Sequence, residues 1–244
     1  MPAFAVENLL RPVPFIFNLL LIRITAMNDT LGCRLYLISP PVVDPVAFPD
    51  IFARALDGGD VASFQLRLKG ATDAEILQMG EKLLPLCSER GIPFILNDRL
   101  DLAKQLGADG VHLGIDDGAV TNKVEQARKL LGENAVIGVS CYDSGDLAIQ
   151  AGEDGADYVS FGAFFPSKTK QSRGKPDPEI LKWWSTWTVL PCVAIGGITA
   201  ENCGILVQQG ADFLAVISAV WDNEAGPAAG VKAVNNAIRS ALEA

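Results

Sequence analysis

One short stretch, SFQLRLK at residues 63–69, alternates apolar side chains with polar and cationic ones. Successive side chains of a strand point to opposite sides, so this alternation predicts a strand with one polar face. That face carries an amide and two cations: Gln65, Arg67 and Lys69. Arg binds phosphate oxygens through a planar fork, and Lys supplies a compact charge. A surface strand would turn such a face to water, but inside an α/β core the face predicts an anionic ligand.

Acidic and amide side chains close the next two predicted strands. Asn97 and Asp98 end one strand, and Asp116 and Asp117 follow the other. Carboxylates at adjacent strand ends can share Mg²⁺, which takes one or two carboxylates together with phosphate oxygens and waters. Each pair also fits a structural role, since Asp98 could cap the next helix and Asp117 could lie in a turn. Because these acidic pairs would lie beside the cationic strand, they favour a site for a diphosphate and Mg²⁺.

The later strand ends carry further groups suited to phosphate. Ser140 ends the fifth predicted strand, and a loop of hydroxyl and ammonium groups follows the sixth: Ser167, Lys168, Thr169 and Lys170. This basic loop is typical of an active-site lid, although an ordinary solvated loop has the same composition. Gly197 ends the seventh strand, and Ile217 and Ser218 end the eighth. Backbone N–H groups after these two strands of a barrel form a recurrent phosphate cup.

Composition and charge narrow the classes of function. The chain has 244 residues, a formal net charge of -9, five cysteines and one histidine, His112. An acidic chain lacks the basic face that nucleic-acid binding needs. A single histidine leaves little room for a His-rich zinc site, and its place within a strand favours a hydrogen-bonded core imidazole over a catalyst. The odd cysteine number, without a Cys-x-x-Cys spacing, indicates free thiols in a reducing compartment, so we expect a cytoplasmic protein.

The first 26 residues differ in pattern from the rest of the chain. The apolar run at 15–24 is too short to span a bilayer, and Glu7 and Arg23 disfavour a signal peptide. We therefore expect residues 1–26 to be a poorly ordered extension outside the fold and residues 27–244 to form one domain. Hydrophobic anchoring of the extension is the alternative.

Short apolar runs alternate with amphipathic segments from residue 33 onward, which predicts eight β-then-α units. The predicted strands are 34–39, 63–69, 93–98, 110–114, 136–141, 158–164, 191–197 and 213–220. The predicted helices are 73–90, 101–107, 121–132, 144–155, 176–185, 199–210 and 227–244. Three Gly-Ala-Asp turns that each lead into a strand support such repetition. Eight right-handed units most simply close into a (β/α)8 TIM barrel, and an open doubly wound sheet is the alternative.

Taken in order, these residues resemble the thiamine phosphate synthase/TenI superfamily. The motifs are QLRLK, ILNDR, GVHLGIDD, IGVS, FFPSKTK, AIGGIT and VISAV, and they lie within residues 33–240. The resemblance implies a single-domain (β/α)8 barrel and a transferase of thiamine biosynthesis. Thiamine phosphate synthases join 4-amino-2-methyl-5-(diphosphooxymethyl)pyrimidine to a thiazole phosphate carboxylate in the presence of Mg²⁺. The substitution is dissociative and yields thiamine phosphate and pyrophosphate.

The resemblance also implies a role for individual residues. The pyrimidine diphosphate site would comprise Gln65, Leu66, Arg67, Leu68, Lys69, Asn97, Ser140 and Lys170. The thiazole phosphate site would comprise Ser167, Lys168, Thr169, Gly197, Ile217 and Ser218. Mg²⁺ would be held by Asp98 and Asp117, and catalysis would rest on Arg67, Lys69, Ser140 and Lys170. The implied partners are two phosphorylated small molecules, without nucleic acid or membrane, and a homo-oligomer is compatible with the sequence.

Three positions depart from the family pattern. Ile115 replaces the usual Gln before the acidic pair, Tyr142 replaces the His of a Ser-x-His motif, and Ser167 replaces the first Thr of the PTxTK loop. The first two changes remove polar groups beside the substrates, while Ser167 keeps its hydroxyl. Tyr142 disfavours the thiazole tautomerase activity of TenI proteins, which uses that His. A non-catalytic phosphoester-binding barrel is the third hypothesis, and the complete diphosphate and metal set disfavours it.

Overall fold

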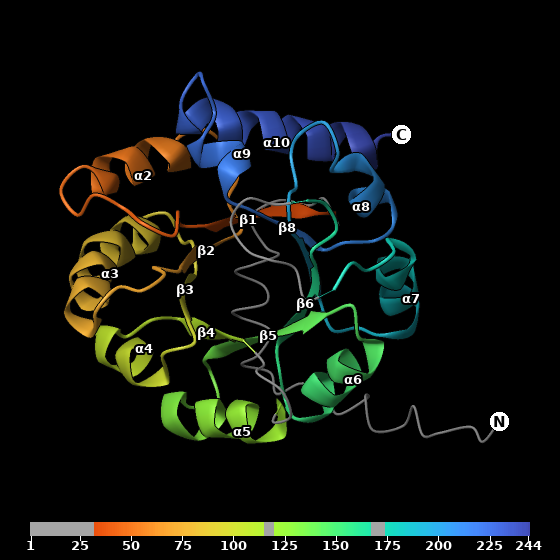
Figure 1. The fold of residues 1–244 in the computed structure, drawn as a ribbon, viewed down its shortest axis with the longest axis horizontal. Coiled ribbons are helices and arrows are strands. Elements are labelled where there is room, and N and C mark those ends of the chain that lie inside the picture. Colours follow the sequence, from red (N-terminus) through yellow and green to blue (C-terminus); the bar gives the residue numbers. More distant parts are fainter. Residues whose placement is uncertain (1–31, 115–119, 167–173) are drawn as a thin grey trace.

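A closed barrel of eight parallel strands forms the centre of the molecule, and helices surround it (Figure 1). The computed structural model describes residues 32–114, 120–166 and 174–244. Each strand pairs with its neighbours in chain order, and the last strand pairs with the first. The predicted (β/α)8 barrel is confirmed, and the open doubly wound sheet is wrong. The predicted boundary after residue 26 lies outside the described residues.

Most of the strands are shorter than the sequence predicts. They are β1 (Arg34–Ile38), β2 (Ser63–Leu66), β3 (Phe94–Asn97), β4 (Gly110–Leu113), β5 (Val136–Tyr142), β6 (Tyr158–Gly162), β7 (Cys192–Ile195) and β8 (Phe213–Val216). Because β2 ends at Leu66, Arg67 and Lys69 follow the strand instead of lying within it. The prediction of a strand over 213–220 is wrong beyond Val216, because Ser218–Trp221 form a short helix.

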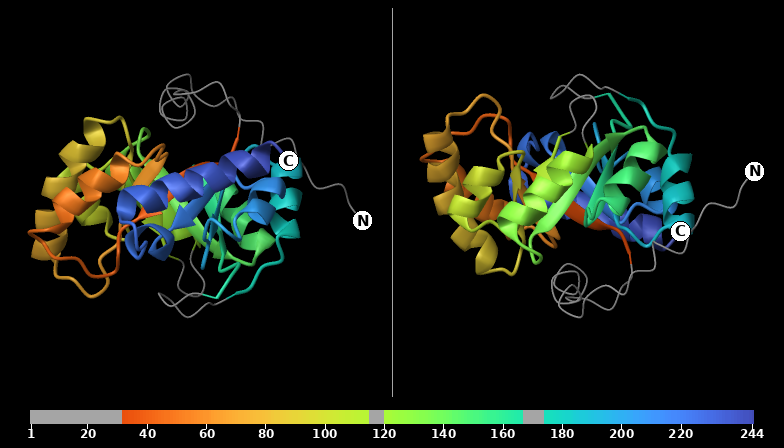
Figure 2. Two further views of the ribbon diagram at one scale, coloured as in Figure 1. Left: turned by 90° about the horizontal axis from the view of Figure 1, so that it is seen from above. Right: turned by 90° about the horizontal axis from the view of Figure 1, so that it is seen from below.

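The helices pack around the outside of the barrel. They are α2 (Phe48–Leu56), α3 (Asp73–Ser88), α4 (Leu100–Leu106), α5 (Val120–Leu131), α6 (Gly145–Glu153), α7 (Glu179–Trp187), α8 (Gly204–Gln208), α9 (Ser218–Trp221) and α10 (Pro227–Leu242). The sequence analysis missed α2, although Phe48, Phe52 and Leu56 recur at helical spacing on its buried face. The long α10 crosses the outside of the barrel and contacts α2, α8 and α9 (Figure 2). In the part of the chain that the structure describes, no helix has the length and apolar character needed to span a membrane.

Apolar side chains pack in two layers, one on each side of the barrel wall. Between the strands and the helices, Phe64 of β2 lies against Phe52 of α2 and Phe94 of β3, with ring centroids 4.2 and 5.8 Å apart. Inside the barrel is a second, smaller cluster: Tyr36, Ile38, Ile95, Val136, Tyr158, Val193 and Ala215. The alternation in SFQL follows from these two layers, since Phe64 faces the helices and Gln65 faces the interior.

Aspartates that precede the even-numbered strands connect neighbouring strands at the amino end of the barrel. In the three Gly-Ala-Asp turns, the carboxylate accepts a backbone N–H from the start of the preceding strand at 2.7–2.8 Å. The pairs are Asp109 with Phe94, Asp157 with Ile137, and Asp212 with Cys192. Before β2, Asp60 instead accepts two hydrogen bonds from the Arg34 guanidinium of β1. The sequence repeat therefore reflects one device that sets the stagger of adjacent strands.

Among these residues, Asp157 is buried with a cationic partner. Its Oδ2 accepts from Ile137 N at 2.7 Å and from Arg128 Nη2 at 2.9 Å. Burial raises the pKa of the Asp157 carboxyl to about 6, and the attraction of Arg128 offsets only part of that effect. An unfolded Asp titrates near pH ~3.9. The stability that this group contributes is therefore complete below about pH 4 and is lost as the pH rises through about 6.

We predict that Asp157→Asn removes this pH dependence. The unfolding free energy of the wild type minus that of the variant should fall by about 2 kcal/mol between pH ~4 and ~7, because one pKa unit corresponds to about 1.4 kcal/mol. Urea denaturation at a series of pH values measures the difference. Asp57→Asn, which breaks the exposed pair with Arg90, is the control and should change stability by less than about 1 kcal/mol at each pH. Parallel curves for the wild type and Asp157→Asn would contradict the assignment.

Candidate active site

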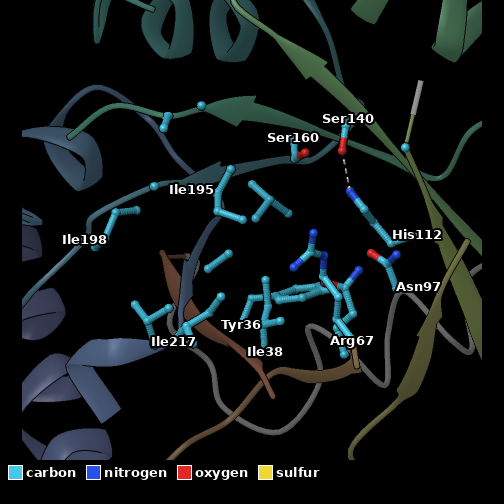
Figure 3. A pocket seen from close by; sticks show the side chains of 18 of the residues that line it. Tyr36, Ile38, Arg67, Asn97, His112, Ser140, Ser160, Ile195, Ile198 and Ile217 are labelled. Carbon is cyan, nitrogen blue, oxygen red and sulfur yellow. Dashed lines mark hydrogen bonds between the residues drawn. The ribbon is translucent and has the colours of Figure 1, made fainter. Parts of the chain in front are cut away.

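A cavity opens at the carboxyl ends of the strands, and residues from all eight strands or the loops that follow them line it. Eight predicted site residues are in this lining: Gln65, Arg67, Asn97, Asp98, Ser140, Gly197, Ile217 and Ser218. Arg67, Asn97, His112 and Ser140 lie on one side of the cavity, and the other side carries Ile195, Ile198 and Ile217 (Figure 3). The structure therefore brings most of the described predicted residues together at the end of the barrel where barrel enzymes react.

The other three described residues of QLRLK lie away from the cavity lining. Leu66 is buried between the barrel and the helices, and Leu68 packs against the same layer. Lys69 is exposed, and its backbone N–H donates to the carbonyl of Pro41. The side chains of these three residues therefore do not form part of the cavity wall that the structure describes.

Gln65 presents an unsatisfied donor at the cavity. Its side chain is 2 % exposed, and its Nε2 has no hydrogen-bond partner among the described residues. A buried polar group without a partner costs about 1–3 kcal/mol. A ligand with an acceptor atom in the cavity would recover this cost, so the amide is suited to donate to a ligand.

Arg67 is positioned through its backbone. Its N–H donates to Ser39 Oγ at 2.9 Å, and the N–H of Ser39 donates to the Gln65 carbonyl at 2.9 Å. These bonds extend the pairing of β1 and β2 past the strand ends, and the Arg67 side chain lies at the cavity near Asn97 (Figure 3). The sequence analysis missed Ser39, because one serine after a strand has no pattern of its own.

Asp98 lies at the rim in the left-handed region, with φ of 60°. Its Oδ2 accepts from Asn97 Nδ2 and its Oδ1 accepts from Gly114 N, each at 2.6 Å. Such a conformation costs about 1–3 kcal/mol for a residue other than glycine, and the two hydrogen bonds hold it. The helix-capping alternative for Asp98 is wrong, because α4 begins at Leu100 after Arg99 and has no side-chain cap.

The donor set at Asp98 fits a magnesium ion that is shared with a ligand. Each carboxylate oxygen keeps a lone pair beyond its one hydrogen bond, and Asp98 is the only carboxylate in the cavity lining that the structure describes. In residues 32–114, 120–166 and 174–244, no three His, Cys, Asp or Glu side chains gather to hold a metal ion. One carboxylate with open lone pairs suits Mg²⁺, which completes its shell with phosphate oxygens and waters.

His112 is hydrogen-bonded at both ring nitrogens. Its Nδ1 lies 3.0 Å from the Tyr158 hydroxyl, and its Nε2 lies 2.9 Å from Ser140 Oγ (Figure 3). The predicted hydrogen-bonded imidazole is confirmed. The ring also lines the cavity, as does Tyr158, whose role the sequence analysis missed.

Tyr142 lines the cavity in an unusual conformation. Its φ is 56°, which is rare for an aromatic residue. The pairing of β5 with β6 shifts in register between Ser140 and Tyr142. Irregularities of this kind re-aim side chains next to binding sites, and here the residue that follows the shift contributes to the cavity wall.

Two glycines after β7 allow the backbone to form part of the wall. Gly196 and Gly197 have φ of 105° and 62°. A Cβ on Gly197 would lie 2.3 Å from the carbonyl oxygen of Pro166, so no larger residue fits without displacing that backbone. Gly197 lines the cavity together with Ile217 and Ser218, which follow β8.

An apolar wall completes the cavity. Its members are Ile38, Ile195, Ile198 and Ile217, which come from β1, β7 and β8 and the segments that follow them (Figure 3). The sequence analysis identified only Ile217 among them, because apolar strand residues on the inner face of a barrel have the same pattern as core residues.

Several predicted site residues lie outside the described part of the chain. They are Asp117, Ser167, Lys168, Thr169 and Lys170, together with the departure at Ile115. Their roles in metal and phosphate binding stay predictions.

Comparison with known proteins identifies the family. The family described as thiamine monophosphate synthase matches residues 35–220. The chain belongs to the thiamine monophosphate synthase family. The predicted family and the predicted enzyme class, a transferase of thiamine biosynthesis, are thereby confirmed.

Individual members of the thiamine monophosphate synthase family match most of the chain. The thiamine-phosphate synthase of Rhodospirillum centenum is 56% identical over 207 residues, which cover 85% of this chain and 98% of the relative. That of Hyphomonas neptunium is 50% identical over 207 residues, covering 83% and 92%. The solved structure of a thiamine phosphate pyrophosphorylase from Pyrococcus furiosus has a TM-score of 0.73 and 32% identity, covering 86% of this chain and 96% of that one.

We predict that Gly197→Ala weakens phosphate binding, because its Cβ would displace the backbone at Pro166. Gly107→Ala is the matched control, since its φ of 66° is similar and open space surrounds the added Cβ. Both variants should lose about 1–2 kcal/mol of unfolding free energy from left-handed strain, and Gly197→Ala should lose more because its Cβ also meets backbone. Only Gly197→Ala should also lower the affinity for inorganic phosphate, by about tenfold or more, which corresponds to about 1.4 kcal/mol. Calorimetric titration of both variants measures this, and equal phosphate affinities would contradict the role of Gly197.

Proposed function

We propose that this protein is a thiamine phosphate synthase. It would couple 4-amino-2-methyl-5-(diphosphooxymethyl)pyrimidine with a thiazole phosphate carboxylate to give thiamine phosphate and pyrophosphate. The observation that carries the proposal is the division of the cavity wall. Donors and one carboxylate from β2 to β5 lie opposite the glycine backbone and isoleucines of β7 and β8. Two phosphorylated substrates need such separate surfaces, one for each phosphate group.

The reaction needs little covalent chemistry from the protein. The bond between the pyrimidine methylene carbon and the diphosphate oxygen breaks, and its electron pair leaves with the diphosphate. The thiazole nitrogen then donates its lone pair to the methylene carbon. The carboxylate group of the thiazole leaves as CO₂, and the ring carbon that held it keeps the electron pair and takes up a proton from water. Because charge grows on the leaving diphosphate, groups that bind it more tightly as it departs accelerate the reaction.

In this proposal, the polar side of the cavity binds the diphosphate. Arg67 would donate through its guanidinium, and Gln65 Nε2, which has no partner among the described residues, would donate to a ligand acceptor. Asn97 would add to this set. Lys69, which lies outside the described cavity lining, and Lys170, which lies outside the described residues, would supply further positive charge. The isoleucine wall would keep water from the cationic methylene carbon, since water is the competing nucleophile.

Magnesium belongs to the same proposal. Asp98 would hold the ion with Asp117, and the remaining ligands would be diphosphate oxygens and waters. When bound, Mg²⁺ neutralises negative charge on the diphosphate and so makes it a better leaving group. The hydrogen bonds from Asn97 and Gly114 would keep the Asp98 carboxylate in position for that ion.

The remaining aspects of the proposal follow from the family and the composition. The partners would be the two small phosphorylated substrates, without nucleic acid or membrane, and the protein would act in the cytoplasm. Residues 27–244 would form the catalytic domain, with residues 1–26 as an extension. Exposed Trp183 and Trp187 on α7 are a candidate contact for a homo-oligomer.

Substitution of Arg67 or Asp98 tests the site. We predict that Arg67→Ala and Asp98→Ala each lower kcat/KM by at least about 100-fold, which is the effect of removing one strong electrostatic group at a transition state. Arg54→Ala, on the exposed face of α2, is the control and should keep wild-type activity. Pyrophosphate release with both substrates present gives the rates, and circular dichroism verifies folding. Near-normal rates in both site variants would overturn the assignment.

Metal removal separates this function from the two alternatives. Pyrophosphate release should stop in EDTA, return with excess Mg²⁺, and need a higher Mg²⁺ concentration in Asp98→Asn, because the amide is a weaker ligand than the carboxylate. A thiazole tautomerase would turn over one substrate without metal, and a binding protein would show affinity without turnover. Either of those results would replace the proposed function.

A further inference from the structure

Four side chains form a continuous hydrogen-bond chain across the interior of the barrel. The Tyr36 hydroxyl lies 2.9 Å from the Tyr158 hydroxyl, which lies 3.0 Å from His112 Nδ1. His112 Nε2 lies 2.9 Å from Ser140 Oγ. The chain therefore runs from two buried phenols, 4 % and 6 % exposed, to a serine at the predicted diphosphate site.

The strand register explains how these groups meet. His112 of β4 pairs with Gly138 of β5, and Gly138 pairs with Tyr158 of β6. A Cβ on Gly138 would lie 2.0 Å from Cζ of Tyr158, so the Tyr158 ring occupies the space that the missing side chain leaves. The rings of Tyr158 and His112 consequently stack, with centroids 5.5 Å apart. The register of three adjacent strands therefore brings His112 and Tyr158 together.

The number of available protons limits the direction in which these four side chains can donate hydrogen bonds to one another. Burial raises the pKa of both phenols, so each keeps its proton. A neutral imidazole has one donor and one acceptor nitrogen. If Tyr36 donates to Tyr158 and Tyr158 donates to Nδ1, then Nε2–H donates to Ser140, and the Ser140 proton is free to face the cavity. In the opposite polarity, Ser140 donates to Nε2 and turns only lone pairs toward the cavity, where they would repel an anion.

We propose that Tyr158 is a positioning residue that keeps His112 protonated at Nε2 and thereby directs the Ser140 hydroxyl proton toward a diphosphate oxygen. This inference rests on the proposed function. The polarity agrees with the other groups on that side of the cavity, because Arg67 and Gln65 Nε2 are also donors.

The single histidine of the chain makes the tautomer directly measurable. In ¹⁵N-labelled wild type, long-range proton–nitrogen spectra should show one imidazole form, protonated at Nε2, and inorganic pyrophosphate should leave that form unchanged. Tyr158→Phe removes the donor to Nδ1, so the Nε2–H form should lose its dominance. Tyr36→Phe is the matched control, because it also deletes one buried hydroxyl but leaves the Tyr158 donor in place and should keep the tautomer. A wild-type imidazole protonated at Nδ1 would overturn the inference, whether or not Tyr158→Phe folds.

Kinetics give the second readout. Tyr158→Phe should raise KM for the pyrimidine diphosphate about fivefold or more, which corresponds to one hydrogen bond of about 1 kcal/mol, and leave KM for the thiazole phosphate unchanged. In a Ser140→Ala background the same change should have little further effect, since the chain then has no serine to direct. Equal losses in both backgrounds would refute the inference. If no preparation releases pyrophosphate, the proposed function fails, while the tautomer spectrum still decides the inference.

Discussion

The strands of a closed parallel barrel have no face toward water. Polar side chains inside the barrel must therefore find their hydrogen-bond partners in the protein or in a ligand. On an open sheet, Gln65 could satisfy its amide with solvent. Inside the barrel it is buried, and its Nε2 has no partner among the described residues. A buried donor of this kind is tolerated where a ligand supplies the acceptor. The same constraint makes the Tyr36–Tyr158–His112–Ser140 chain necessary, because each of its polar atoms must find a partner inside the barrel.

The cavity is divided in a way that suits a reaction through separated charges. Donors and the Asp98 carboxylate lie on the side formed by β2 to β5, and isoleucines and glycine backbone lie on the side formed by β7, β8 and β1. Under the proposed function, the first surface would bind the departing diphosphate, and the second would protect the cationic methylene carbon from water. Neither surface requires a general base, which agrees with a histidine whose two nitrogens are occupied by structural hydrogen bonds. Catalysis here would rest on position and electrostatics.

The sequence predicted the barrel and the polar rim because both depend on local periodicity. The alternation in SFQL correctly separated Phe64, which faces the helices, from Gln65, which faces the interior. Features that depend on contacts distant in the chain were missed. Ser39 binds Arg67 across 28 positions, and Tyr158 reaches His112 only because Gly138 lies between them in the sheet register. The strand over 213–220 was wrong beyond Val216 because apolar periodicity alone does not separate a short buried strand from the helix that follows it.

The two ends of the barrel have different roles, one in strand stagger and the other in forming the cavity. At the amino end, the carboxylates of Asp109, Asp157 and Asp212 connect β4, β6 and β8 to the strands before them, so these bonds set strand stagger at the end away from the cavity. At the carboxyl end, strained residues such as Asp98 and Tyr142 are held by local bonds and by packing. A rim residue can therefore change while the register that positions its neighbours stays the same. The register that the amino-end aspartates set therefore allows residues of the cavity rim to vary.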